Sequence, residues 1–468
     1  MSALERRAVA ALACLYVFRM LGLFMLLPVL PLYAADYAFS TPVLVGLALG
    51  IYGLGQAVLQ IPLGMLSDRI GRKPVIVAGL LLFAAGGVLA ASAESIFTVI
   101  FGRLMQGAGA IASTLTATVA DLTREQHRSK AMAAIGVSIG VSFAVAMVVG
   151  PGVAASFGVP ALFLLTSALA ILGVVVAVFV VPSSRIQSRD PSARPLASLL
   201  LRCIRSPSLM RLNVGVFVLH MAMMALFLVL PARLMELGLA PAEHWMVYLP
   251  VMAAAFVLMV PALIVAEKKS WQAVILRLAI ALLAGVLLLA SVLPFSLVSV
   301  LAVLLLFFTA FNYLEASLPA LLSRSVYAGG KGTAMGVFAS FQFMGAFCGG
   351  ALGGWVLGHW GEAAVFLAAG LAGLLWLACT VGAVVCLPFA PGLLRELGEA
   401  PASSTWWLVY LGGFPTAIAF TTYAFALKHM SASNLGVTTY LVPPITIVMG
   451  WLALGETPPT MAYAGGAL

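Results

Sequence analysis

Long apolar stretches separated by short polar loops run along most of the chain. About 20 consecutive apolar residues are enough to cross a bilayer as an α-helix, whereas the strands of a membrane barrel would be shorter and would alternate. We count twelve such stretches, near 8–34, 43–66, 74–92, 96–121, 129–157, 159–181, 208–236, 244–265, 271–293, 295–323, 331–358 and 362–388. The pattern therefore predicts an all-α membrane protein with twelve spanning helices.

The longest polar interruption divides these stretches into six and six, and it is rich in Ser, Pro and Arg. We expect an N-terminal six-helix half over 1–181, a linker over 182–207 and a C-terminal six-helix half over 208–390. The basic turn from Asp68 to Lys73 has a degenerate counterpart, Glu267-Lys268-Lys269, after the eighth stretch. Internal correspondence of this kind indicates a duplicated unit, as in many transporters.

Composition and charge agree with a membrane protein. The chain is 63% hydrophobic and 8% charged, against about 25% charged residues in soluble domains. Its net charge of +9 lies in short loops without interleaved aromatic residues, which predicts topology signals rather than nucleic-acid binding. With the N-terminus in the cytoplasm, nineteen of the 24 Lys and Arg lie in or beside cytoplasmic segments. We therefore expect a bacterial inner-membrane protein with a cytoplasmic N-terminus and a cytoplasmic linker.

One basic loop follows a particular spacing, Gly64-x-x-x-Asp68-Arg69-x-Gly71-Arg72-Lys73. The two glycines allow close packing or a sharp turn. Asp68 and Arg72 are i, i+4 neighbours if the helix continues. This spacing resembles the loop signature of the major facilitator superfamily.

Other segments extend that resemblance over residues 5 to 390. Arg103-x-x-Gln106-Gly107-x-Gly109 resembles a second signature of the superfamily, and Gly150-Pro151 resembles part of its antiporter motif, although Ala154 and Ala155 replace the terminal glycines. The chain is most similar to the YajR-type drug:proton antiporters in four stretches, 19–28, 60–64, 121–126 and 331–336. The resemblance implies two six-helix halves with a site between them near the membrane midplane, and a rocker-switch mechanism.

The same resemblance implies a conformational latch built from Gly64, Asp68, Arg69, Gly71, Arg72, Lys73 and Asp121. Arg72 would pair with Asp121, and Asp68 would face the N-terminus of the eleventh span near Gly332 and Thr333. A helix N-terminus favours a nearby carboxylate by about 0.3–1 kcal/mol. Topology alone would account for Arg69 and Lys73, but not for Asp68.

Four ionisable residues lie inside predicted spans: Arg19, Arg103, His220 and Glu315. A charge in hydrocarbon costs at least about 2.5–3.5 kcal/mol, so each is a functional candidate. Glu315 is the one acidic residue well inside the twelve stretches. A carboxyl group that is neutral when dry and ionised when wetted can bind a proton from one side and release it to the other, and histidine can do the same. We expect these four residues to include the proton-coupling groups, Glu315 first.

Alternative roles exist for each of these residues. Glu315 could be a permanent ion-pair partner of Arg19, and His220 a neutral hydrogen-bonded core group. Arg103 could couple protonation to helix movement or could bind backbone carbonyls, and the second is favoured. Polar residues that could line a substrate cavity are Tyr52, Gln56, Gln60, Asn312 and Gln342, although each alone is more typical of helix–helix packing.

No enzyme motif fits the chain, and its five cysteines lack metal-ligand spacing. We expect no cofactor, no metal site and no nucleic-acid partner. The expected partners are a small-molecule substrate, protons and membrane lipid. The sequence thus favours proton-coupled efflux of hydrophobic or cationic small molecules. The alternatives are proton-coupled uptake of a small metabolite, with Arg19 binding an anionic group, and a non-transporting membrane sensor or scaffold.

The last part of the chain differs from the rest. A polar linker over 391–404 leads into a segment over 405–468 that resembles the last three helices of an EamA-type drug/metabolite transporter repeat, through Thr416-Ala-Ile-Ala-Phe420, Leu441-Val-Pro443 and Leu454-Gly455-Glu456. We expect two to three extra membrane helices there. A gene fusion, an engineered joint and an assembly of two unrelated sequences are the origins that account for such a junction.

Overall fold

The computed structural model describes residues 1–109, 111–182, 196–294, 296–326 and 331–378. The chain divides into two compact units, Met1–Ala383 and Val384–Leu468, and all described residues belong to the first. The predicted linker over 391–404 and the EamA-like segment over 405–468 lie outside the described residues.

The described residues are almost entirely helical. The α-helices are α1 Ala3–Phe24, α2 Leu30–Tyr33, α3 Pro42–Ile70, α4 Arg72–Ala91, α5 Ile96–Ala108, α6 Ala112–Leu122, α7 Glu125–Phe179, α8 Leu196–Arg205, α9 Pro207–Glu236, α10 Trp245–Lys268, α11 Gln272–Ala290, α12 Leu297–Ser325 and α13 Lys331–Ala378. Two 3₁₀ turns, η1 Ala34–Asp36 and η2 Pro241–Glu243, complete the elements. The all-α prediction is confirmed.

Ten helical segments in the described part are long and apolar enough to cross a membrane. Two of these, in α7 and α13, hold two predicted spans each, joined at Gly158 and Gly361. Both glycines have φ of 78°, which only glycine adopts without strain. Because they occupy the same place in each half, between the fifth and sixth spans, these corners are a second trace of the duplication.

The structure departs from the predicted spans in three places. The first span ends at Phe24, and a turn containing Pro28 separates it from α2, because proline cannot donate the hydrogen bond that continues a helix. The fourth span is broken between Ala108 and Ala112 into α5 and α6. The predicted linker contains the helix α8, which the polar composition of the segment concealed.

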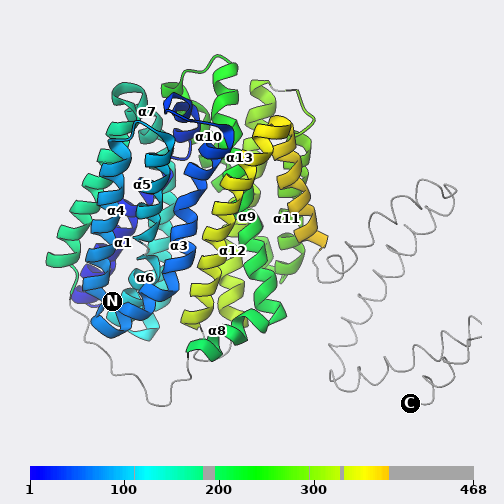
Figure 1. Ribbon diagram of the computed structural model, residues 1–468. Helices are drawn as coiled ribbons and strands as arrows, with labels where there is room; N and C mark the ends of the chain where they lie inside the picture. The colour runs from blue at the N-terminus through cyan, green and yellow to red at the C-terminus, as the bar shows by residue number, and fades with distance from the viewer. Residues whose placement is uncertain (110, 183–195, 295, 327–330, 379–468) are drawn as a thin grey trace, which may run out of the picture. The chain divides into compact units, whose positions relative to one another are not determined.

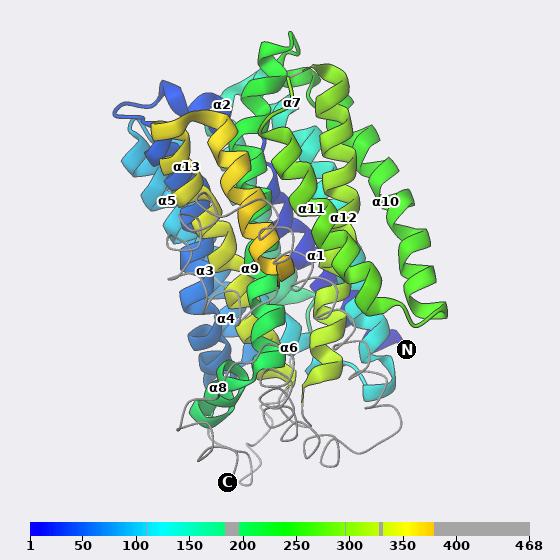
Figure 2. The same ribbon diagram turned by 90° about the vertical axis from the view of Figure 1, so that its right-hand side faces the viewer.

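Figure 1 shows α1 and α3–α7 gathered on one side of this unit and α9–α13 on the other. The N-terminus and α8 lie at one end, where α3 finishes and α13 starts; we name this the basic end and the opposite one the far end (Figures 1 and 2). Large apolar side chains such as Phe157, Val257 and Val298 are exposed on the outside. An apolar exterior of this extent is suited to lipid.

The closest packing between the two halves joins α3 to α13. Gly46 and Gly50 of α3 lie so near α13 that an added Cβ would come within 2.6 Å of Gly354 Cα or of the Phe347 carbonyl oxygen. Further along, the Ser340 hydroxyl donates to the Ala57 carbonyl at 3.1 Å. At the basic end an added Cβ on Gly332 would meet nothing within 4 Å. The two helices are therefore in backbone contact towards the far end, whereas the contact loosens towards the basic end, where an added Cβ on Gly336 would lie 3.9 Å from Ile61 Cγ1.

Candidate functional site

Three polar side chains from three helices of the C-terminal half meet in the apolar interior. The Gln342 side-chain nitrogen on α13 lies 2.8 Å from His220 Nε2 on α9 and 3.2 Å from Glu315 Oε1 on α12. His220 Nε2 and Glu315 Oε2 are 3.7 Å apart. We name these residues the His–Gln–Glu cluster. The structure thus brings together two of the predicted proton-coupling candidates and one predicted cavity residue.

The hydrogen bonds of the cluster define the tautomer of His220. Its Nδ1 lies 3.1 Å from the Val216 carbonyl oxygen, which can only accept, so Nδ1 carries a hydrogen. In the neutral ring Nε2 then accepts from the Gln342 amide, whose second hydrogen points to the Glu315 carboxylate. In this arrangement Glu315 Oε1 accepts from Gln342, whereas Glu315 Oε2 is buried and has no hydrogen-bond partner among the described residues.

The exposed fraction of the side chain differs between the two titratable members. The His220 side chain is 10% exposed, whereas that of Glu315 is 42% exposed. The expectation that apolar neighbours enclose Glu315 is therefore only half met, because one face of the carboxylate is open. If water reaches the exposed part of Glu315, a carboxylate next to a buried imidazole is a suitable arrangement for proton exchange.

The polar residues of the N-terminal half form a separate group. The Arg19 Nη2 donates to the Tyr52 hydroxyl at 3.1 Å, and the Gln56 amide donates to the same hydroxyl at 3.3 Å. Arg19 is 2% exposed, and its Nε and Nη1 have no hydrogen-bond partner among the described residues. The alternative of a permanent Arg19–Glu315 ion pair is not what the structure contains, since each of them has partners in its own half.

Arg103 binds backbone carbonyls. It is fully buried, and its Nε and Nη2 donate to the carbonyl oxygens of Ala48 and Leu49 at 3.4 Å each. Its guanidinium lies 5.1 Å from the centre of the Tyr52 ring. The geometry agrees with the favoured alternative, in which Arg103 ties α5 to α3; its role in proton coupling stays a prediction.

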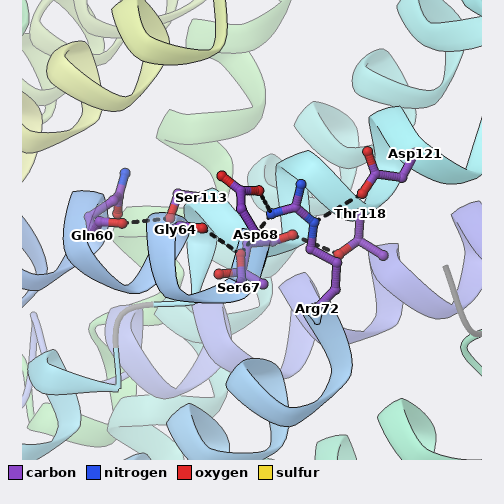
Figure 3. Close-up of polar contacts among 9 residues, drawn as sticks. Gln60, Gly64, Ser67, Asp68, Arg72, Ser113, Thr118 and Asp121 are labelled. Atoms are coloured by element: carbon purple, nitrogen blue, oxygen red, sulfur yellow. Dashed lines mark hydrogen bonds and ion pairs between the residues drawn. The ribbon is translucent and has the colours of Figure 1, made fainter. Parts of the chain in front are cut away.

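The predicted ion pair of the basic loop is present. Arg72 Nε lies 2.9 Å from Asp121 Oδ2, and Arg72 Nη1 lies 2.5 Å from Asp68 Oδ1 and 2.7 Å from the Ser67 hydroxyl (Figure 3). Asp68 was expected to face the start of the eleventh span, and this stays a prediction. The ion-pair partner that the structure gives Asp68 is Arg72.

Backbone shape explains why the loop contains glycine. Gly71 has φ of 98°, and in the repeated turn Ser270 also has a positive φ, of 56°. Gly64 packs against Ser113 of α6, so a Cβ there would lie 3.1 Å from the Ser113 hydroxyl. Arg69 is exposed, and Lys73 donates to the Val178 carbonyl at 3.1 Å. A residue with positive φ is thus present in the turn of both halves. The ion pairs of Arg72 with Asp68 and Asp121 are in the N-terminal half.

Replacing Arg72 with glutamine is expected to lower the free energy of unfolding by about 1 kcal/mol, because exposed ion pairs contribute less than that and charged hydrogen bonds somewhat more. Arg69→Gln removes the same charge from an exposed neighbour and should have little effect. Thermal unfolding in detergent would compare the two. A double variant with Asp121→Asn should be no less stable than Arg72→Gln alone, and full additivity would contradict the pairing.

Besides Tyr52 and Gln56, the other two predicted cavity residues also lie outside the cluster. Gln60 is buried, and its side-chain carbonyl has no partner among the described residues, while its backbone carbonyl accepts from the Ser113 hydroxyl at 2.8 Å. Asn312 is half-buried, three residues before Glu315 on α12. The structure does not bring either of them into the His–Gln–Glu cluster.

Four aromatic rings, absent from the sequence predictions, join the two halves on the far side of the cluster. The ring centre of Phe143 on α7 lies 4.8 Å from that of Phe24 in the same half. It lies 6.2 Å and 6.0 Å from the ring centres of Phe227 and Phe308 in the other half. Phe227 and Phe308 each lie seven residues from a cluster member towards the far end, about 10 Å at 1.5 Å per residue. We name these four residues the aromatic plug. Its signal in the sequence, isolated Phe residues, is not distinguishable from ordinary apolar packing.

Opening the aromatic plug should expose the cluster to the far side. In a background without native cysteines, a cysteine in place of Glu315 should react slowly with a membrane-impermeant reagent added at the far side. Adding Phe143→Ala should raise that rate several-fold, because the removed ring leaves a gap between the halves. Phe157→Ala, on the same helix but 76% exposed, is the matched control. Equal labelling in the two variants would show that Phe143 does not close the path.

Comparisons with known proteins assign both parts of the chain. A model of the Major Facilitator Superfamily matches residues 12–347, and a model of the EamA-like transporter family matches residues 360–468. The inner membrane transport protein YajR of Escherichia coli (strain K12) is 44% identical over 375 residues, which cover 80% of this chain and 82% of YajR. A probable terminal-alkyne amino-acid exporter of Streptantibioticus cattleyicolor is 39% identical over 87 residues, 19% of this chain and 29% of that protein.

A solved structure shares the fold of the first unit. A bacterial homologue of the human lysosomal transporter Spinster, in an inward-facing and occupied conformation, has a TM-score of 0.66. The match covers 81% of this chain and 96% of that one, at 15% sequence identity. At this identity the likeness concerns the fold alone.

Proposed function

Because the chain belongs to the major facilitator superfamily and is a multi-pass membrane transporter, we propose that it exports hydrophobic or cationic small molecules in exchange for protons by alternating access. The His–Gln–Glu cluster is the observation on which this proposal depends. Export through such a path would exchange a proton for substrate at Glu315, with His220 as the second site. Arg19, buried in the facing half, would adjust the field around them.

The looser contact between α3 and α13 at the basic end supports the proposed direction of opening. We place the basic end in the cytoplasm of a bacterium and the protein in its inner membrane, because basic loops favour the cytoplasmic side. In this orientation the glycine contacts and the aromatic plug would close the periplasmic side, and Glu315 would be reached from the cytoplasm. Closing the cytoplasmic side would bring Asp68 towards the start of α13, so the ion pairs of Arg72 belong to a latch that rearranges between states. Such states differ by only a few kcal/mol.

The direction of proton movement tests the proposal. Ligands would first be found by thermal shift with a panel of lipophilic cations, and the full chain would then be reconstituted with a pH-sensitive dye inside the vesicles. If the protein is an antiporter, substrate that moves into the vesicles drives protons out of them. Proton movement in the same direction as the substrate would replace antiport with uptake, and substrate movement without any proton movement would refute coupling.

One observation favours uptake as the second candidate. The Arg19 guanidinium is buried, and two of its nitrogen atoms have no partner among the described residues. An unpaired cation of this kind can bind a carboxylate or phosphate group. Uptake would be supported if a small anionic metabolite and protons moved across the membrane in the same direction. This joint movement should be lost in Arg19→Gln.

A further inference from the structure

The helix α8 is amphipathic, and part of its apolar surface is exposed. Cys203 is 1% exposed and Leu200 packs against the core, so these residues mark the side of α8 that contacts α9 and α13. Leu201 and Ile204 are 47% and 50% exposed. At about 100° per residue, they lie side by side on the flank next to the buried side. We name Leu201 and Ile204 the apolar flank.

A basic flank follows the apolar flank around the same helix. Arg202 and Arg205 are exposed and lie three residues apart, so they are neighbours on one side of α8. Arg211, four residues into α9, is exposed as well. Neither Arg205 nor Arg211 forms an ion pair with another described residue. Positive charge therefore gathers where α8 meets α9, and no described carboxylate neutralises these two arginines.

The place of α8 brings both flanks to the level of the membrane surface. The spanning helix α9 begins at Pro207, and Ser206 before it has an extended backbone with φ of −78° and ψ of 113°, so α8 does not continue along the axis of α9. Figure 1 shows α8 at the basic end. The 30 residues of α9 make a helix about 45 Å long, against about 30 Å of hydrocarbon in a bilayer. Its ends, and α8 beside one of them, therefore reach the headgroups.

We propose that α8 lies in the membrane interface at the basic end and binds the headgroups of anionic phospholipids. The apolar flank lies among the upper parts of the acyl chains, as in other interfacial helices. Arg205 and Arg211 donate to lipid phosphate groups, which the planar guanidinium can bind through two N–H groups at once. Their Cα atoms are at most about 13 Å apart, from two residues of chain and four of helix, so they can bind one lipid or two neighbouring lipids.

The pairing of the two flanks favours lipid as the occupant over a second protein. A membrane with anionic lipid offers negative charge directly above hydrocarbon, and α8 offers positive charge directly beside apolar side chains. A basic end that lies on the more anionic leaflet would agree with the distribution of basic loops. The inference depends neither on proton coupling nor on the direction of transport, and it goes beyond the proposed function.

Contact between α8 and lipid can be measured in the full chain. In a background without native cysteines, Ile204→Cys would carry a fluorescent label, and the protein would be reconstituted in phosphatidylcholine vesicles. A nitroxide quencher high on one acyl chain would be supplied on a small amount of either phosphatidylglycerol or phosphatidylcholine. Both lipids should quench the label, because the apolar flank lies among acyl chains. Phosphatidylglycerol should quench it more strongly, by up to about fivefold for each arginine, and added salt should reduce this preference.

Removal of the two arginines tests the headgroup site. Arg205→Gln with Arg211→Gln should lose most of the preference for phosphatidylglycerol, while quenching by phosphatidylcholine stays as in the parent. Arg6→Gln with Arg7→Gln is the matched control, because it removes two exposed arginines at the same end of the other half, and it should keep the preference.

Three results would overturn the proposal. A label that neither lipid quenches would show that the apolar flank lies outside the membrane. Equal quenching by the two lipids in the parent, or equal loss of the preference in both pairs of variants, would leave no headgroup site at α8. Shielding of the label that increases with the density of protein in the vesicles would show that a second copy covers the apolar flank.

Discussion

Replacing Glu315 with glutamine is expected to abolish substrate movement driven by a pH gradient while the protein stays folded. Glutamine has the shape of glutamate, and its Oε1 can still accept from the Gln342 amide, so the contacts of the cluster persist. It cannot ionise, however, and the proposed exchange of a proton for substrate then has no site. In reconstituted vesicles the gradient-driven rate should fall to that of vesicles without protein.

Two measurements separate loss of coupling from loss of structure. Exchange of labelled for unlabelled substrate without a pH gradient needs no net proton movement, and it should continue in Glu315→Gln. Glu267→Gln, an exposed carboxyl group at the basic end of α10, should leave gradient-driven transport unchanged. If gradient-driven transport survives in Glu315→Gln, Glu315 is not the coupling group and His220 becomes the first candidate.

The lengths of the apolar stretches predicted the fold almost completely, because the thickness of a bilayer sets the length of each spanning helix. The points that it missed depend on single residues or on tertiary contacts. Pro28 ends the first span early, and the break before α6 follows close packing at Gly107, where an added Cβ would lie 2.9 Å from Tyr52 Cα. The helix α8 was missed because its segment is polar overall, although one face of it is buried at Cys203.

The search for ionisable residues inside predicted spans identified most of the candidate site. The remaining contacts depend on the three-dimensional structure and on its conformation. His220 and Glu315 were both predicted as proton-coupling candidates, and the structure places them beside each other. Gln342 was predicted only as one of several cavity residues, because a sequence does not reveal that its amide lies between two titratable groups. The expected contact of Asp68 with the start of α13 stays a prediction for another reason. A transporter has at least two states, and a motif describes contacts from all of them, whereas a structure contains those of one.

The glycine contacts of α3 could have been predicted but were not. Gly46, Gly50 and Gly53 recur at helical spacing, and Gly350 and Gly354 of α13 do the same. Small residues at this spacing are typical of close helix contacts in membranes. Among the described residues these contacts lie towards the far end and the middle of α3. The proposed alternating access requires the halves to move apart there without unfolding, so a side chain at such a contact should change conformation rather than stability.

Gly46→Val is therefore expected to hold the far side open and to stop transport without unfolding the protein. Its Cβ would lie 2.6 Å from Gly354 Cα, and backbone cannot give way as a flexible side chain can. Separation of the halves relieves this clash, so the cysteine at Glu315 should become reactive from the far side, as in Phe143→Ala. Gly285→Val on α11, where an added Cβ meets nothing within 4 Å, is the control and should behave as the parent.

Gly107→Val is expected to reduce stability rather than to change conformation. Its clash with Tyr52 lies within the N-terminal half, where no movement between halves relieves it. Overpacking of this kind costs about 1–3 kcal/mol or more, so this variant should lose thermal stability and folded yield. Gly46→Val should retain both. If the two variants lose stability equally, the contact of α3 with α13 is a permanent part of the core, and the closing contacts of the far side must lie elsewhere.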